Sequence, residues 1–307
     1  MGVLGLRIDV CTFEGLKKGV LPIVEALRRR RLRATFFPTI GPDRSGRAVL
    51  RIFRKKGFLS KMVRTRAVSL YGWRTLLYGT LLPAPRIGQR LGDVLRRTAG
   101  EGHEVGVHAW DHVRWQDSID HLPESVLHDD YAQAVEAFEK VVGRPPESTA
   151  APAWITSEAA LLEAERFGFR YASDTRGTGP FRPILRGKSS KVPQVPITLP
   201  TLDEVLGRDG ATAETFSSQV FNSLRPDGAN VLCVHAESEG RAYLGVFESF
   251  LERCLSLGWE IVPLEELLSR QKGELLGLPV VRGDVPGRAG QVSIQGAALD
   301  RQNPGQP

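Results

Sequence analysis

The chain has 307 residues, 41% of them hydrophobic and 25% charged, and a formal net charge of +6. These are ordinary globular values, and the length allows one large α/β domain or two smaller ones. Its three cysteines lack framework spacing, which argues against a disulfide-stapled secreted protein. We expect a cytoplasmic protein with no signal peptide and no membrane span, because no basic segment precedes an apolar h-region and no apolar run approaches about 18 residues.

The first predicted element is a strand over Leu4–Val10, which ends in an acid followed closely by a cysteine. Strand side chains alternate between two faces, so Arg7, Asp9 and Cys11 are expected on one face. An acid near the C-terminal end of a core strand is where α/β folds place their chemistry. Asp9 equally suits a cap for the following turn or helix, and this stretch alone leaves both roles open.

Strand-like and helix-like segments alternate along the rest of the chain. Helices are predicted over 20–32, over 128–143 with Gly143 at its end, and over 157–168 with Ser157 as N-cap. Further strands are predicted within 33–40, 103–110, 148–154, 170–175, 194–200, 230–237 and 259–264. This alternation of about seven units predicts an α/β fold whose largely parallel sheet is closed, or nearly closed, into a (β/α) barrel.

Two segments interrupt this alternation. Residues from about 43 to 98 are predicted to form an insertion between the second and third strands. The tail from about residue 273 is rich in Gly, Pro and Gln, and we expect poor order toward its end. The sequence therefore predicts a single barrel domain over 1–272 and a partly disordered tail over 273–307.

The histidines point to a metal. All six lie between His103 and His235, and His108 and His112 are four apart at a predicted strand end. That spacing places two imidazoles on one face of a helical turn, as a metal ion requires, although surface or capping histidines show it too. His235 and Asp174 close two further predicted strands, and polar groups gathered at one rim of a sheet favour a functional site.

At these positions the chain resembles the polysaccharide deacetylase-like (carbohydrate esterase family 4) hydrolases, which are built on a distorted (β/α) barrel. The family pattern is an acid pair in the first strand, His-x-x-x-His, and a histidine on a late strand. The blocks "GLRIDV", "SLYGW", "HEVGVHAWDH", "VPITLPT" and "VVRG" are most similar to members that deformylate a lipid-linked amino sugar. The similar blocks extend from Gly5 to about Gly283, nearly the whole chain.

This resemblance implies a metal-dependent amidohydrolase. Its substrate would be 4-deoxy-4-formamido-L-arabinose linked to undecaprenyl phosphate, and its product would serve lipid A modification and resistance to polymyxin and other cationic peptides. One divalent ion (zinc, manganese or cobalt) would polarise the formamide carbonyl and water. The site residues that the resemblance implies are the base Asp9, the acid His235, its orienting carboxylate Asp174, and the metal ligands Cys11, His108 and His112.

The chain departs from the family pattern in the third motif. The family often carries an arginine there that steadies the base, whereas Ala150–Trp154 has none. Arg7, on the strand face of Asp9, or Arg176 is expected to substitute. Trp154 and the backbone N–H groups of the same segment are expected beside the substrate, where such groups can hold an oxyanion.

The larger departure is Cys11, where the family has an aspartate as third metal ligand. A thiolate favours zinc and disfavours manganese or magnesium, and Cys-His-His with an open position is a catalytic zinc arrangement. The alternative is that the loss of a carboxylate weakens the site and leaves a slow or inactive enzyme.

The predicted insertion contains a basic stretch, Arg51–Leu82, that mixes cations with aromatic and aliphatic side chains. It suits a helix with a solvated basic face, a segment that binds anionic lipids, or a nucleic-acid-binding segment, but no nucleic-acid motif accompanies it. The implied lipid-linked substrate favours peripheral contact with the cytoplasmic side of the inner membrane and no nucleic-acid partner. The residues expected to make this contact are Arg54, Lys55, Lys56, Lys61, Tyr71 and Trp73.

Two other functions stay open from the sequence: a deacetylase of another N-acylated sugar, and a catalytically impaired lipid-binding relative created by Cys11. The physiological metal, the oligomeric state and the lipid-chain specificity are also left open.

Overall fold

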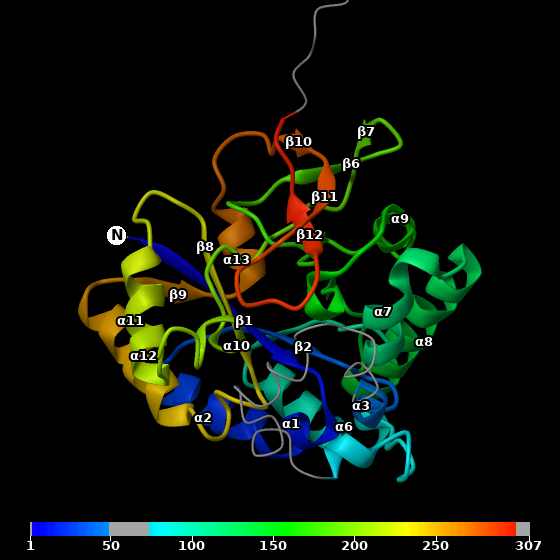
Figure 1. The fold of residues 1–307 in the computed structure, drawn as a ribbon, viewed down its shortest axis with the longest axis horizontal. Coiled ribbons are helices and arrows are strands. Elements are labelled where there is room, and N and C mark those ends of the chain that lie inside the picture. The colour runs from blue at the N-terminus through cyan, green and yellow to red at the C-terminus, as the bar shows by residue number, and fades with distance from the viewer. Residues whose placement is uncertain (1, 49–73, 299–307) are drawn as a thin grey trace, which may run out of the picture.

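The computed structural model describes residues 2–48 and 74–298 and is built around a parallel sheet (Figure 1). The sheet order is β3 (Glu104–Val105), β2 (Thr35–Pro38), β1 (Val3–Val10) and β8 (Asn230–His235). β9 (Glu260–Val262) pairs with the first residues of β1, whereas β2 pairs with its last four. β1 is therefore paired on both edges along most of its length, as a central strand must be.

Further backbone hydrogen bonds link the two edge strands of this sheet, β3 and β8, through other segments of the chain. The Val107 N–H donates to Ser148, which joins β3 to β4 (Ser148–Thr149), and β4 pairs in parallel with β5 (Tyr171–Ala172). The Val195 N–H donates to Ala172, and the N–H groups of residues 198 and 199 donate to Val231 of β8. The predicted α/β fold with a largely parallel sheet is confirmed, and these bonds join the strands in the order of a distorted barrel.

Helices connect and cover the strands. The predicted helices are α2 (Val20–Arg29), α8 (Glu124–Val142) and α9 (Glu158–Arg166), and Ser157 accepts a hydrogen bond from the Ala160 N–H as N-cap of α9. The other described helices are α1 (Phe13–Lys18), α3 (Ser45–Ala48), α6 (Ile87–Gly100), α7 (His112–Ser118), α10 (Leu202–Val205), α11 (Ala213–Ser223), α12 (Leu244–Ser256) and α13 (Leu264–Ser269). Short 3₁₀ turns are η2 (Thr75–Leu77), η3 (Ile119–His121) and η4 (Pro152–Trp154). Within the described ranges, no helix is both long and apolar enough to cross a bilayer.

β1 separates two hydrophobic clusters because its side chains alternate between faces. Leu4, Leu6, Ile8 and Val10 belong to the cluster that packs beneath the surrounding helices. The opposite face of the sheet contributes to a second cluster, which we call the inner cluster; it contains Phe37, Val231, Cys233 and Leu264. Burial of both clusters supplies the main driving force for folding.

The inner face of β1 is polar at its C-terminal end. In the strand register, Asp9 lies between Phe37 of β2 and His235 of β8. Parallel strands present their C-terminal ends at one edge of a sheet, so Asp9 and His235 emerge side by side.

The two predicted interruptions are smaller than the sequence suggested. Residues 87–100 form α6, the crossover helix between the parallel strands β2 and β3, so the alternation resumes before residue 98. Residues 49–73 and 299–307 lie outside the described part of the chain.

The packed fold also extends past residue 272. Residues 277–295 contain β10 (Gly277–Leu278), β11 (Val280–Gly283) and β12 (Val292–Gln295), and Val292 and Ser293 are buried. β10 pairs with β6 (Arg182–Leu185), which pairs with β7 (Lys188–Ser189), and β11 pairs with β12 as an antiparallel hairpin. The end of the predicted tail, residues 299–307, lies outside the described residues, so the expected poor order there stays a prediction.

Candidate metal centre and active site

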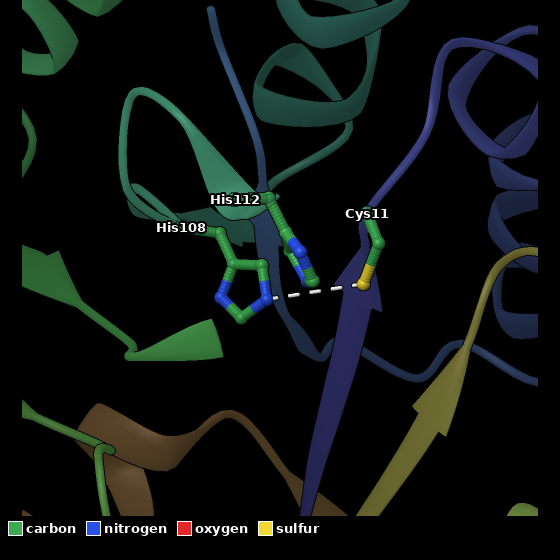
Figure 2. Close-up of side chains that lie close together, drawn as sticks. All are labelled: Cys11, His108 and His112. Carbon is green, nitrogen blue, oxygen red and sulfur yellow. Dashed lines mark hydrogen bonds between the residues drawn. The ribbon is translucent and has the colours of Figure 1, made fainter. Parts of the chain in front are cut away.

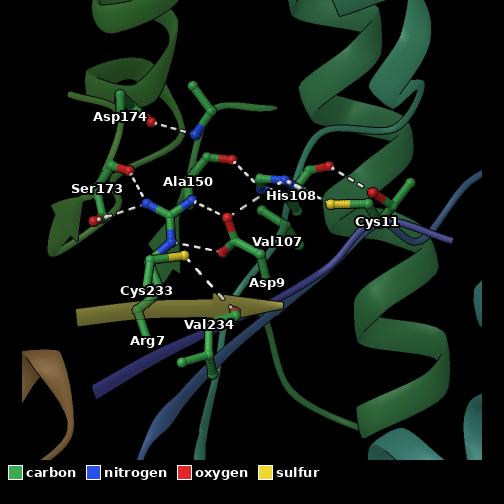
Figure 3. Close-up of polar contacts among 12 residues, drawn as sticks. Arg7, Asp9, Cys11, Val107, His108, Ala150, Ser173, Asp174, Cys233 and Val234 are labelled. Carbon is green, nitrogen blue, oxygen red and sulfur yellow. Dashed lines mark hydrogen bonds and ion pairs between the residues drawn. The ribbon is translucent and has the colours of Figure 1, made fainter. Parts of the chain in front are cut away.

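Asp9 is held by Arg7, two residues earlier on the same strand face (Figure 3). Arg7 Nε donates to Oδ1 at 2.6 Å and Nη2 donates to Oδ2 at 2.7 Å, a bidentate ion pair between two buried side chains. Arg7 Nη1 also donates to the carbonyl and hydroxyl oxygens of Ser173. Burial opposes ionisation of Asp9, but the Arg7 guanidinium outweighs it and holds the pKa of Asp9 well below its usual range.

Of the two arginines expected to steady Asp9, the structure pairs Arg7 with it. Arg176 instead donates to Glu204 at 2.8 Å and to the Leu199 carbonyl at 2.9 Å. Its guanidinium carbon lies 5.1 Å from the ring centroid of Trp154. Arg176 therefore supports the wall of the site and not the acid.

Cys11, His108 and His112 converge beyond the end of β1 (Figure 2). Their donor atoms lie within 4.8 Å of one another, and Cys11 Sγ is 3.9 Å from His108 Nε2. His108 lies in the loop after β3 and His112 is the first residue of α7, so the pair does not share one helical face as the spacing suggested. The loop brings the rings to a centroid distance of 5.2 Å, with Ala109 at a φ of 56°. A positive φ at a residue other than glycine is a strain that packing must maintain.

His108 is oriented as a metal ligand by a backbone group. Its Nδ1 lies 2.8 Å from the Ala150 carbonyl, so we assign the proton to Nδ1, which leaves the Nε2 lone pair for the cluster. Burial lowers the pKa of His108 to about 4, so the ring is neutral near pH 7. Burial, reinforced by Glu237 and Asp9, raises the pKa of the Cys11 thiol, whereas a bound divalent cation favours the thiolate.

The residues present fit a divalent ion. Metal bonds of about 2.0–2.3 Å in a tetrahedral site separate neighbouring ligand atoms by roughly 3.3–3.8 Å. The 3.9 Å between Cys11 Sγ and His108 Nε2 is close to that range. One thiolate and two imidazoles with an open position is a donor set that suits catalytic zinc.

His235 faces Asp9 from the next strand. The donor atoms of Asp9, Cys233 and His235 also lie within 4.8 Å of one another. Trp154 contacts His235 edge to face, with ring centroids 6.3 Å apart. Ala153 and Trp154 have φ values of 56° and 55°, and two such residues in succession cost about 1–3 kcal/mol each. The surrounding packing therefore holds the indole against His235 despite local strain.

Asp174 is placed differently from the role that the family resemblance implies. Its Oδ1 accepts from the Ala151 N–H at 2.7 Å, and its Oδ2 accepts from Gln194 Nε2 at 3.0 Å. Both oxygens thus have partners other than His235, and burial raises the pKa of Asp174 to about 6. The carboxyl group connects the loop after β4 to residue 194. It also occupies the Ala151 N–H, one of the groups expected to bind an oxyanion.

Glu237 is a site residue that the sequence reasoning missed. Its Oε1 accepts hydrogen bonds from the Cys11 N–H at 2.9 Å, the Thr12 N–H at 2.9 Å and the Thr12 hydroxyl at 2.8 Å. A Cβ at Gly15 would lie 2.0 Å from this oxygen, so any larger residue there would displace the Glu237 carboxylate. Glu237 therefore fixes the turn that carries Cys11. A usable signal was present: an acid two residues after His235 repeats the spacing of Asp9 and Cys11.

Thr12 settles the alternative role of Asp9. Its hydroxyl accepts from the Gly15 N–H as N-cap of α1. The first helix is thus capped by Thr12, and Asp9 is committed to Arg7.

The residues expected to contact lipid, Arg54, Lys55, Lys56, Lys61, Tyr71 and Trp73, lie outside the described residues.

The chain is similar to proteins of one known family. The polysaccharide deacetylase family model matches residues 5–172. A Shewanella sediminis protein named probable 4-deoxy-4-formamido-L-arabinose-phosphoundecaprenol deformylase ArnD is 37% identical over 299 residues, covering 97% of this chain and 96% of that protein.

Solved structures share the fold. A Mycobacterium smegmatis protein described as a polysaccharide deacetylase superposes with a TM-score of 0.63 at 17% identity, covering 92% of this chain and 94% of that one. A family 4 acetyl xylan esterase from Clostridium thermocellum, in complex with a cobalt ion, has a TM-score of 0.52 at 16% identity and covers 87% and 90%.

We expect the purified protein to bind one divalent ion per chain, and the double variant His108→Ala with His112→Ala to bind none, because one thiolate alone cannot hold the ion. Elemental analysis of the dialysed proteins measures this directly. The matched control is His121→Ala with His128→Ala, two exposed histidines whose loss should leave the metal content unchanged. Full occupancy in the first variant would place the metal elsewhere.

Proposed function

The chain belongs to the polysaccharide deacetylase family, and we propose that it removes the formyl group from 4-deoxy-4-formamido-L-arabinose linked to undecaprenyl phosphate. The observation that carries this proposal is the cluster of Cys11, His108 and His112. It lies beside His235 and beside Asp9, which is ion-paired with an arginine. The similarity to a named deformylase spans almost the whole chain. The resulting amine would serve lipid A modification and resistance to polymyxin and other cationic peptides.

Hydrolysis adds water across the amide bond: the water oxygen attacks the formyl carbon, the C–N bond breaks, and formate and the sugar amine leave. Cys11, His108 and His112 would hold a divalent ion, which would supply the Lewis acidity that polarises a carbonyl and acidifies water. Asp9 accepts the proton of the attacking water, and His235 donates a proton to the departing nitrogen. The strand register places the two groups side by side, so one substrate can reach both.

The ion pair with Arg7 lowers the basicity of Asp9 but fixes the position of its carboxylate. A carboxylate with a lowered pKa accepts a proton only transiently, so its contribution depends on position. The bidentate pair fixes both carboxylate oxygens, and Oδ2 lies 3.9 Å from His108 Nε2. Asp9 is thereby directed toward the space beside the metal ligands.

We predict that Asp9→Asn and His235→Ala each retain metal and lose at least about 100-fold in the rate of formate release, the usual contribution of general acid–base catalysis. Metal content measured on the same samples reports that the variants are folded. Metal loss in the His235 variant would make that residue a ligand and not the acid. If the wild type released acetate from the N-acetyl analogue faster than formate from the formamide, the function would be a deacetylase.

We further propose that Cys11 is a working thiolate ligand and that the resident metal is zinc. In support, its sulfur lies within the ligand cluster, and Glu237 fixes the backbone on which it stands. A soft thiolate lowers affinity for manganese relative to zinc, so the thiolate and the metal preference are linked.

We therefore expect Cys11→Asp to shift the metal preference of the reconstituted protein from zinc toward manganese or cobalt by at least about tenfold, since a carboxylate suits harder cations. Dissociation constants for each metal measure the shift. Cys254→Ala, which removes a buried thiol from α12, is the control and should leave the preference unchanged. A Cys11→Asp protein with higher activity on every metal, zinc included, would instead show that Cys11 weakens the enzyme.

Finally, we propose that the stretch Arg51–Leu82 contacts anionic lipid at the cytoplasmic side of the inner membrane, where a lipid-linked substrate would lie. The support is its sequence composition, cations interspersed with aromatic side chains. Each Lys or Arg near an anionic surface contributes about 1 kcal/mol, so four of them change partitioning roughly a thousandfold.

Neutralising Arg54, Lys55, Lys56 and Lys61 together should release the protein from anionic vesicles in a cosedimentation assay, and salt should weaken the wild-type binding because exposed charges are screened. The matched control neutralises four exposed cations elsewhere: Arg96, Arg97, Lys140 and Arg144. Vesicle binding that survives the first set of changes, or is lost equally with the control set, would reject the docking role of this stretch.

A further inference from the structure

The β11–β12 hairpin is hydrogen-bonded to two loops that carry residues of the site. The Arg176 N–H donates to the Ser293 carbonyl at 2.9 Å, and the Gln295 N–H donates back to the Arg176 carbonyl at 2.8 Å. The Thr156 N–H donates to the Ser293 hydroxyl at 3.0 Å. The hairpin thus joins the loop after β4, which holds Trp154, to the loop after β5. In Figure 1 it is the red hairpin labelled β11 and β12, in the upper centre of the view.

The turn of this hairpin delivers Arg288 to the active site. Gly287 has a φ of 88°, and a Cβ there would lie 2.0 Å from the Glu204 carbonyl oxygen, so the turn sits directly on α10. The next residue, Arg288, places its guanidinium carbon 4.6 Å from the ring centroid of Trp154. Trp154 in turn contacts His235, so one indole separates Arg288 from the proposed acid.

Arg288 differs from the other two arginines around this indole in how its donors are used. Arg7 directs all three nitrogens to Asp9 and Ser173, and Arg176 directs two to protein acceptors. Among the described contacts, Arg288 directs Nη1 alone, at 3.0 Å, to Asp203. The Nε and Nη2 of Arg288 have no acceptor within the described residues, so they can bind a ligand anion beside the Asp203 ion pair.

A second donor at the same place also lacks an acceptor. Trp154 is 1% exposed, and its Nε1–H has no hydrogen-bond partner within the described residues. A buried N–H without an acceptor costs free energy that a ligand oxygen would recover. The wall formed by Trp154 and Arg288 therefore combines an unpartnered buried N–H with one cation.

We propose that Arg288 binds the phosphodiester group of the lipid-linked sugar and so selects this substrate over uncharged N-acyl sugars. This inference rests on the proposed function. The formamide and the phosphate are attached at opposite ends of one pyranose ring, so when the nitrogen lies at His235 the phosphate lies across the sugar. A guanidinium presents a planar fork to two phosphate oxygens, and stacking on an indole keeps that plane oriented.

The test compares two soluble formamides: a short-prenyl phosphate-linked formamido-arabinose and its uncharged methyl glycoside. Arg288→Gln should lower the preference for the phosphate-linked compound, as a ratio of kcat/KM values, by about 10- to 100-fold, the range for a lost bond to a charged group. The loss should appear in KM with kcat little changed, and Arg288→Lys, which keeps the charge, should recover part of it. The matched control is Arg253→Gln. It removes an arginine of α12 whose guanidinium carbon lies 4.0 Å from the ring centroid of Phe221.

An Arg288→Gln protein that loses activity equally on both compounds, with an unchanged ratio, would overturn the proposal and reduce Arg288 to packing against Trp154. Calorimetric titration with the phosphate-linked sugar amine, the reaction product, separates this inference from the deformylase function. Weaker binding by Arg288→Gln supports the phosphate contact even if the wild type hydrolyses neither formamide, a result that would reject deformylation alone. Equal binding by both proteins overturns the contact.

Discussion

The buried ion pair between Arg7 and Asp9 is the interaction on which the rest of the molecule depends. Moving two charges out of water costs several kcal/mol per ion, and only close geometry with further hydrogen bonds offsets that cost. Arg7 meets the condition by donating to both oxygens of Asp9 and, across the ring of strands, to Ser173. The pair therefore connects β1 to the chain just after β5 and directs the carboxylate at the same time. Removing either charge would leave the other buried and unpaired.

The proposed metal ligands are likewise held in place by groups behind them. His108 is oriented by the Ala150 carbonyl, and Cys11 stands on a turn that Glu237 holds with three hydrogen bonds. Neither supporting group belongs to the donor cluster, yet each removes a degree of freedom from a proposed ligand. Such second contacts usually matter nearly as much as the ligands, because a site that is loose by about 1 Å loses both affinity and rate. The positive φ values at Ala109, Ala153 and Trp154 show where the backbone is strained to bring these groups together.

The titratable groups of the candidate site differ in charge state. Asp9 is kept ionised by a cation, whereas burial keeps His108 neutral and raises the pKa of Asp174 to about 6. A charged carboxylate, a neutral imidazole and a carboxyl group with a raised pKa thus lie within one small region, and their neighbours set these charge states. Cys11 adds a donor whose charge state depends on the metal, so metal identity and site chemistry are linked.

The sequence by itself determined the parts of this protein that depend on local pattern. Alternation in β1 predicted that Arg7, Asp9 and Cys11 share a face, and the helix signals at Ser157 and Gly143 marked real helix ends. Spacing and strand-end positions marked His108, His112 and His235, and the resemblance to the family supplied their roles, which are proposals. Only the tertiary structure decided which long-range partner each polar group takes: Arg7 and not Arg176 for Asp9, Ala151 and Gln194 for Asp174, and Glu237 for the turn at Cys11.

The C-terminal hairpin shows the reason most clearly. Its Gly- and Pro-rich composition has no local preference for order, and its structure comes from contacts with residues 156, 176 and 204, more than 80 positions away, which no local pattern contains.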